Sequence, residues 1–143
     1  MIHFIKGLSE IRIKKILLAL NFLSALVLML SPFVLFPVCQ ELRADGTRMK
    51  CFDSGIFITV IAVLILIVLA LSFLFNKFPN LSLSFASVLA FACWFVPEKF
   101  TGLCGNPEHA CRAITMPYVG VFAALIVLLS FTGLIFNFIG GKD

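Results

Sequence analysis

The run ILLALNFLSALVLMLSPFVLFPV, residues Ile16–Val38, decides the fold of this chain. It contains no Asp, Glu, Lys, Arg or His over 23 residues. As an α-helix it would be about 34 Å long at roughly 1.5 Å per residue, enough to cross a hydrocarbon core of about 30 Å. Three further runs lack the same charged residues and His; they are Gly55–Asn76, Leu81–Val96 and Pro117–Ile139. The sequence therefore predicts an all-α membrane protein, a bundle of four transmembrane helices.

The composition agrees with this prediction. Of the 143 residues, 62% are hydrophobic and 13% are charged, whereas soluble domains have about 45 to 50% and 25%. We expect one four-helix membrane domain over residues 1–143. The third run has only 16 residues, about 24 Å of helix, so we expect Phe78 and Phe100 to lengthen it or the bilayer to thin around it.

The basic residues predict the orientation. Residues 1–15 hold four of them against one acid, Glu10, and the link between the second and third spans adds Lys77. The four are Lys6, Arg12, Lys14 and Lys15. Because basic residues close to a span stay in the cytoplasm, we expect a multi-pass protein of the inner or plasma membrane with both termini cytoplasmic. Residues 1–15 fit either a short interfacial helix or a plain basic flank.

With this topology, four of the five cysteines lie in the two outer loops and Cys93 lies in a span. Cys39 and Cys51 share the first loop, and Cys104 and Cys111 share the second. An even set of cysteines on an oxidising face indicates disulfides, with three connectivities open. A turn signature at residues 44–47 and a short helix expected from residue 107 toward 114 favour pairing within each loop.

Small and polar residues suggest how the spans pack. Ser82, Ala86 and Ala90 recur every four residues, as do Gly120 and Ala124, and such stripes let helices approach closely. We expect them to pack inside the bundle; a homodimer face is the alternative.

Polar residues in and around the spans receive three further assignments. Asp53 or Ser54 is expected to cap the second span and Asn80 the third. Interhelical hydrogen bonds are expected at the uncharged polar residues within the spans, Asn21, Thr59 and Asn137.

The sequence around the cysteines resembles a bacterial and archaeal family of small four-helix membrane proteins of unknown function. The resemblance rests on five short motifs: Pro37-Val38-Cys39, Met49-Lys50-Cys51, Gly102-Leu103-Cys104-Gly105, Cys111-Arg112 and Thr115-Met116-Pro117. The family pattern has a His after the second cysteine and a Met before the fourth, where this chain has Phe52 and, approximately, His109. The resemblance implies a helix bundle with paired outer cysteines.

Two function classes remain. The first is a non-enzymatic accessory or interaction subunit of a membrane complex, such as a transporter, with structural disulfides capping its outer face. The second is a membrane thiol-disulfide oxidoreductase that uses the outer cysteine pairs. Lys50 and Arg112 adjoin Cys51 and Cys111, and a neighbouring cation lowers the pKa of a thiol and favours the thiolate.

Other classes have little support in the sequence. A metal or haem site would draw on His109, Met49, Met116 and reduced cysteines, which competes with disulfide formation. Ion or proton transport usually leaves ionisable residues in the spans, and these spans have none. The net charge of +4 comes mostly from the N-terminal segment and offers no face for nucleic acid. We assign no catalytic residue, metal ligand or cofactor.

Overall fold

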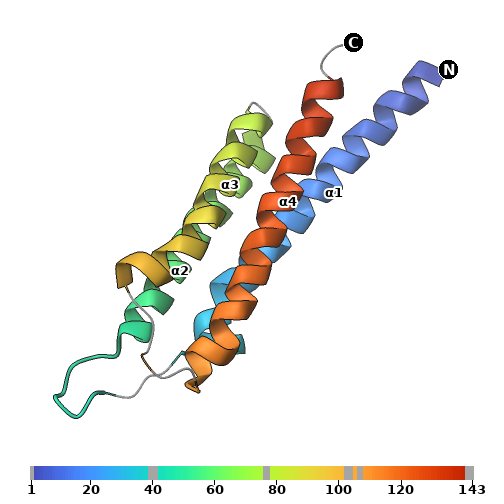
Figure 1. The fold of residues 1–143 in the computed structure, drawn as a ribbon. Coiled ribbons are helices and arrows are strands. Elements are labelled where there is room, and N and C mark those ends of the chain that lie inside the picture. The colour runs from blue at the N-terminus through green and yellow to red at the C-terminus, as the bar shows by residue number, and fades with distance from the viewer. Residues whose placement is uncertain (1, 39–41, 76–77, 102–104, 106–107, 141–143) are drawn as a thin grey trace.

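The computed structural model describes residues 2–38, 42–75, 78–101, 105 and 108–140. These residues form four long helices, α1 (Ile2–Leu30), α2 (Lys50–Phe75), α3 (Pro79–Val96) and α4 (Met116–Gly140). The helices alternate in direction along one axis (Figure 1). The beginning of α1 and the end of α4 lie at one end, the terminal end, and residues 36–38, 42–49, 97–101 and 108–115 lie at the other, the loop end.

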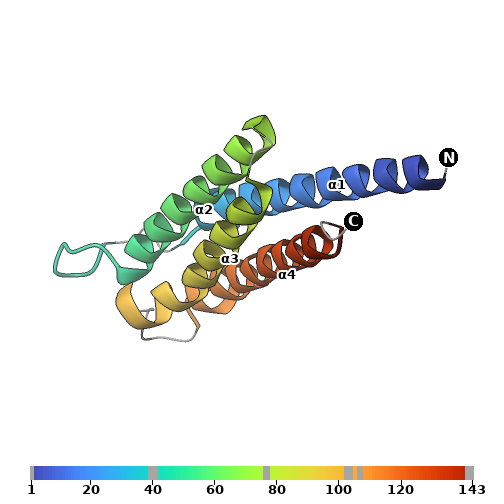
Figure 2. The same ribbon diagram turned by 90° about the horizontal axis from the view of Figure 1, so that it is seen from above.

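The helices form a closed ring. Each helix packs against the next one in the chain, and α4 packs back against α1. Seen from above, α3 runs beside α4, and α1 and α2 cross each other (Figure 2). Such a ring is the up-down-up-down topology expected when neighbouring helices are joined by short links.

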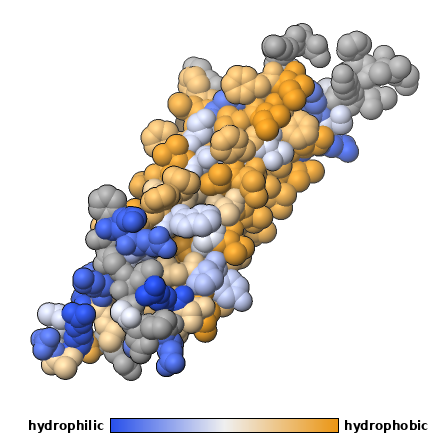
Figure 3. Space-filling view, in the orientation of Figure 1, coloured by the Kyte–Doolittle hydropathy of each residue, from blue (hydrophilic) through white to orange (hydrophobic). Residues whose placement is uncertain are grey.

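All four helices are long and apolar enough to span a membrane, as the sequence predicted. The candidate spans are Gly7–Leu35, Lys50–Phe75, Pro79–Lys99 and Cys111–Ile139. Apolar side chains cover the middle of the molecule, and most of the hydrophilic ones on this face gather at the loop end (Figure 3). Large apolar residues are exposed along every helix, which is the surface that contact with a lipid bilayer requires.

Among the described residues, three π-helical segments complete the spans at the loop end. They are η1 (Ser31–Leu35), η2 (Pro97–Thr101) and η3 (Cys111–Thr115). Pro32 lies in η1, because a proline cannot donate the backbone hydrogen bond of an α-helix. The segment η2 follows directly on α3 and lengthens the shortest span toward the loop end.

Small residues line the core, with one shift from the prediction. On α3, Ser82, Ala86 and Ala90 are buried as expected. On α4 the buried row is instead Val119, Ala123, Ile126 and Ser130. Gly120 and Ala124 are only half-buried. The expectation for α4 was wrong by one position, because spacing alone does not set the rotation of a helix about its axis.

The helix ends also differ from the sequence prediction. Helix α2 begins at Lys50, so Asp53 lies in its first turn, and the Ser54 hydroxyl donates to the Lys50 carbonyl at 3.1 Å. The N-cap of α3 is Phe78, and Asn80 is already helical. None of these three polar residues therefore caps its helix as expected. Helix α1 runs unbroken from residue 2, so residues 2–15 continue the first span.

The polar residues within the spans also behave differently from the expectation. The Thr59 hydroxyl donates to the Gly55 carbonyl of its own helix at 3.0 Å. Both polar atoms of the Asn21 amide are buried and have no hydrogen-bond partner in the described structure. Interhelical hydrogen bonding therefore explains neither residue. Asn137 lies at the terminal end, beside a cavity described below.

Candidate functional site: the paired cysteines at the loop end

Two cysteines from different loops meet at the loop end. Cys51 lies in the first turn of α2 and Cys111 is the first residue of η3. Their sulfur atoms are 2.8 Å apart although the residues are 60 positions apart in the chain. This distance is within contact range and longer than the roughly 2.05 Å of a disulfide bond. Both side chains are 0% exposed.

An apolar shell surrounds the two sulfurs. Val38 is buried against them, and Phe33 and Phe52 pack around the same cluster. The two rings are edge-on, with centroids 5.8 Å apart. Above the Phe52 ring lies the Arg48 guanidinium, 5.3 Å from its centroid. The cysteine pair is thus covered by hydrocarbon on the inside and by a cation-π contact nearer the surface.

Gly55 lets the first loop close over the cysteines. A Cβ at this position would lie 3.1 Å from a methyl group of Val38 and 3.4 Å from Pro32. The backbone after η1 can therefore approach α2 only because residue 55 has no side chain. The Val38 N–H donates to the Pro32 carbonyl at 2.8 Å, which turns the chain toward the sulfurs.

A second set of contacts ties η1 to α4. The Thr115 hydroxyl, in η3, donates to the Phe36 carbonyl at 3.1 Å. The Phe36 ring stacks on Tyr118, with centroids 4.0 Å apart and planes 13° from parallel. The end of the first span is thus joined both to α2, through the cysteine cluster, and to α4, through Phe36.

The first loop contains the turn that its sequence predicted. Gly46 has a φ of +75°, and its N–H donates to the Arg43 carbonyl at 2.8 Å. Leu42 and Arg48 form an antiparallel bridge across the turn. In the second loop the expected separate short helix is absent from the described residues. Pro117 does not interrupt the chain there, because η3 runs directly into α4.

The structure brings together only part of the predicted site. Cys51 and Cys111 are adjacent, whereas Cys39 and Cys104 lie outside the described residues. The side chains of Lys50 and Arg112 are exposed, in contrast to the buried sulfurs beside them in sequence. No group of three or more His, Cys, Asp or Glu residues that could hold a metal ion occurs among the residues described.

Sequence reasoning missed the residues that enclose the sulfurs. Val38, Phe33 and Phe52 were assigned only to a span end or to the family pattern. A signal was present, since Gly55 begins the uncharged run of residues 55–76, where a glycine weakens helix formation. A glycine at such a position can indicate close approach of another segment.

The fold and these contacts define a multi-pass membrane protein whose four helices are tied together at one end by buried cysteines and aromatic rings. Residues 21–136 match the domain of unknown function DUF4418, and the chain belongs to this family. The match includes all of the cysteine segments described above. No curated protein sequence and no solved structure matches the chain.

Proposed function

We propose that this protein is a non-enzymatic accessory or interaction subunit of a membrane complex, such as a transporter, whose outer face is held by structural disulfides. The observation that carries the structural part is the contact of two fully buried sulfurs from different loops, Cys51 and Cys111. The basic N-terminal segment supports placing the termini in the cytoplasm, and the loop end would then face the oxidising side of the inner or plasma membrane.

Burial argues for a structural role of these cysteines. Thiol-disulfide exchange needs a thiolate that can reach the partner sulfur. Here Val38, Phe33 and Phe52 cover the sulfurs, and buried cysteines in apolar surroundings are usually inert. The two sulfurs are in hydrogen-bonding contact and are not bonded to each other in the structure; a disulfide formed between them on oxidation, 60 positions apart in the chain, would stabilise the fold by about 4 kcal/mol in the chain-entropy model. Pairings of Cys39 and Cys104 remain part of the proposal.

The surface of α4 supports the interaction part. Gly120 and Ala124 are spaced four residues apart and are not used fully inside the bundle. A Cβ at Gly120 would meet no atom within 4 Å. The two residues line a shallow groove next to Trp94 of α3. Small residues at this spacing allow another transmembrane helix to pack closely.

Co-purification in mild detergent tests the interaction role. Wild-type protein is expected to retain a membrane-protein partner. Gly120→Leu should lose the partner while the monomer keeps its stability, because the position faces open space. Ala19→Leu changes a small, exposed residue of the first span in the same way; it is the control and should keep the partner. Wild-type protein that purifies alone after cross-linking in intact membranes would contradict the proposal.

A thiol-disulfide oxidoreductase is the second candidate. It is favoured by the meeting of one cysteine from each loop, Cys51 and Cys111, which is the geometry needed to pass a disulfide between two loop pairs. In such a reaction the oxidised pair accepts two electrons and two protons from a substrate dithiol and passes them to a membrane quinone. Lys50 and Arg112 would favour the thiolates of their neighbours.

Trapping thiols in intact cells distinguishes the two candidates. Free thiols are blocked with a maleimide before lysis, and non-reducing peptide mapping then gives pairing and occupancy. Full, stable oxidation of Cys51 and Cys111 favours the structural role. Partial reduction, together with mixed disulfides to other proteins, favours the oxidoreductase. The free thiol of Cys93, buried in α3, serves as the internal reference for a cysteine that should remain reduced.

A further inference from the structure

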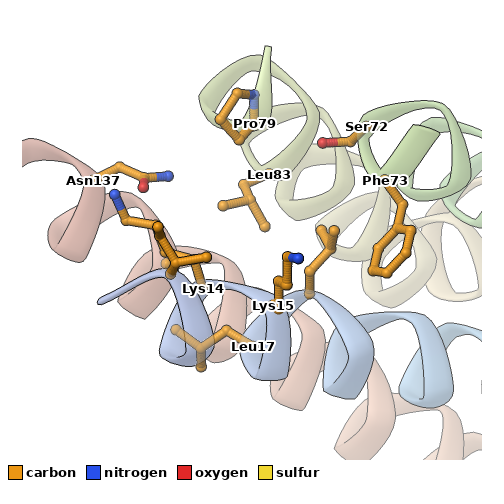
Figure 4. A pocket seen from close by; sticks show the side chains of 11 residues that line it. Lys14, Lys15, Leu17, Ser72, Phe73, Pro79, Leu83 and Asn137 are labelled. Atoms are coloured by element: carbon orange, nitrogen blue, oxygen red, sulfur yellow. The ribbon is translucent and has the colours of Figure 1, made fainter. Parts of the chain in front are cut away.

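A cavity opens at the terminal end of the bundle, on the opposite side of the molecule from the cysteines. Its volume is about 260 Å³, and all four helices contribute to its lining. Figure 4 shows Lys14 and Lys15 entering from α1, Ser72 from α2, Leu83 from α3 and Asn137 from α4. The cavity therefore combines two cations and two neutral polar groups with an apolar wall.

Ser72 is the strongest sign of a ligand. Its side chain is 6% exposed and lines the cavity. The hydroxyl is buried and has no hydrogen-bond partner in the described structure. Burial of a hydroxyl without a hydrogen-bond partner lowers the stability of the fold. An oxygen atom of a ligand in the cavity would remove this cost by accepting the Ser72 hydrogen.

The charges and the wall specify the chemistry of the ligand. Lys14 and Lys15 lie on the first part of α1, near the bundle end, where they can meet an anionic headgroup at the membrane surface. Below them the wall is apolar, with Leu83 and Phe73 among its residues. A purely ionic ligand would leave this wall unused, and a purely apolar one would leave two cations and Ser72 unused.

We propose that this cavity binds one anionic phospholipid of the leaflet at the terminal end. The phosphodiester meets Lys14 and Lys15, Ser72 and Asn137 donate to phosphate or ester oxygens, and the first part of one acyl chain packs against Leu83 and Phe73. A volume of about 260 Å³ is at the small end for ligand pockets, so the rest of the lipid stays in the bilayer.

The role of the lysines in membrane topology does not account for the site. Basic residues next to a first span orient the chain wherever they lie on the helix surface. Here two of them line a cavity, whereas Arg12 on the same helix does not. Topology also gives no reason for a buried serine hydroxyl to remain without a partner.

The test uses the full chain, purified in a neutral detergent, and measures lipid binding by native mass spectrometry and by thermal unfolding. Phosphatidylglycerol is the anionic probe, phosphatidylcholine the zwitterionic one, and inorganic phosphate the headgroup alone. Wild-type protein should bind one phosphatidylglycerol and unfold at a higher temperature, with little effect of the other two probes. Equal effects of phosphatidylcholine or of inorganic phosphate would overturn the proposal without the use of any variant.

Variants test the residues. Lys14→Gln and Lys15→Gln should each weaken phosphatidylglycerol binding by about fivefold, and the double variant by about 25-fold. Arg12→Gln, with the same charge change on an exposed neighbour, is the matched control and should change binding by less than about twofold. Equal losses for Arg12→Gln and the lysine variants would show general attraction to the membrane surface and overturn the site.

Ser72→Ala distinguishes a ligand-binding role of the hydroxyl from a structural role. In lipid-free detergent it should be as stable as wild type or more stable, because the hydroxyl has no bond to lose. With phosphatidylglycerol it should bind about three- to tenfold more weakly. Unchanged lipid binding in Ser72→Ala would contradict the assigned role of the hydroxyl and overturn the proposed site.

Discussion

Replacement of Cys51 and Cys111 by alanine, singly and together, tests whether the two sulfurs cross-link the loops. If they are bonded, the cross-link contributes about 4 kcal/mol for a separation of 60 residues. Each buried sulfur adds roughly 1 kcal/mol of packing. Each single variant should then lose about 5 kcal/mol and the double variant only about 6, since the bond is lost once. The coupling energy between the two sites would be about 4 kcal/mol.

The assay is reversible unfolding of the purified protein in mixed micelles, followed by circular dichroism. Reductant should lower wild-type stability by about 4 kcal/mol more than it lowers the stability of the double variant. Cys93→Ala is the control, because it removes a free buried thiol of α3. Compared with wild type under the same conditions, with or without reductant, it should be less stable only by the lost packing energy.

Additive losses in the double variant would refute the cross-link. So would wild-type stability that does not respond to reductant after the protein is fully unfolded and refolded in its presence. Either result would reduce the Cys51 and Cys111 contact to packing of two thiols in an apolar shell, and the structural part of the proposed function would lose its main support.

Three further perturbations test the packing of the bundle. Gly55→Ala should be about 1 to 2 kcal/mol less stable than the matched helix variant Gly7→Ala. The reason is that a Cβ at residue 55 meets Val38, whereas a Cβ at residue 7 meets open space. Equal unfolding free energies of the two variants would contradict the close approach of Val38 to α2. Asn21→Leu should leave stability unchanged or raise it by up to about 2 kcal/mol, since it removes an amide without a described hydrogen-bond partner; a large loss measured by unfolding would show that the amide has a partner. Thr115→Val should cost about 1 kcal/mol by breaking the bond to the Phe36 carbonyl, whereas Thr132→Val, on an exposed face, should cost less than half of that in the same assay.

The number and the approximate limits of the spans follow from the sequence alone. Crossing a bilayer needs about 20 apolar residues in one uninterrupted helix, and that property is local, so uncharged runs such as Ile16–Val38 reveal it directly. The turn at Gly46 was equally readable, because residues 44–47 carry their own turn chemistry. The caps at Asp53, Ser54 and Asn80 were misread, since the helices α2 and α3 begin a few residues earlier than their apolar runs.

The candidate sites depend on the tertiary structure. The sequence identified Cys51 and Cys111 as members of different loop pairs, and the helix ring brings these two sulfurs into contact. The expected pairing within each loop stays a prediction, because Cys39 and Cys104 lie outside the described residues. Helix spacing likewise suggested Gly120 and Ala124 as the buried row of α4, and the rotation of the helix placed Val119 and Ala123 inside instead. The cavity of Lys14 and Ser72 has no sequence signal, because its walls come from four helices. Membrane insertion depends on the hydropathy of each segment, which can be calculated from the sequence. Contacts between segments depend on how rigid helices rotate and pack against one another, which is determined only in the assembled bundle.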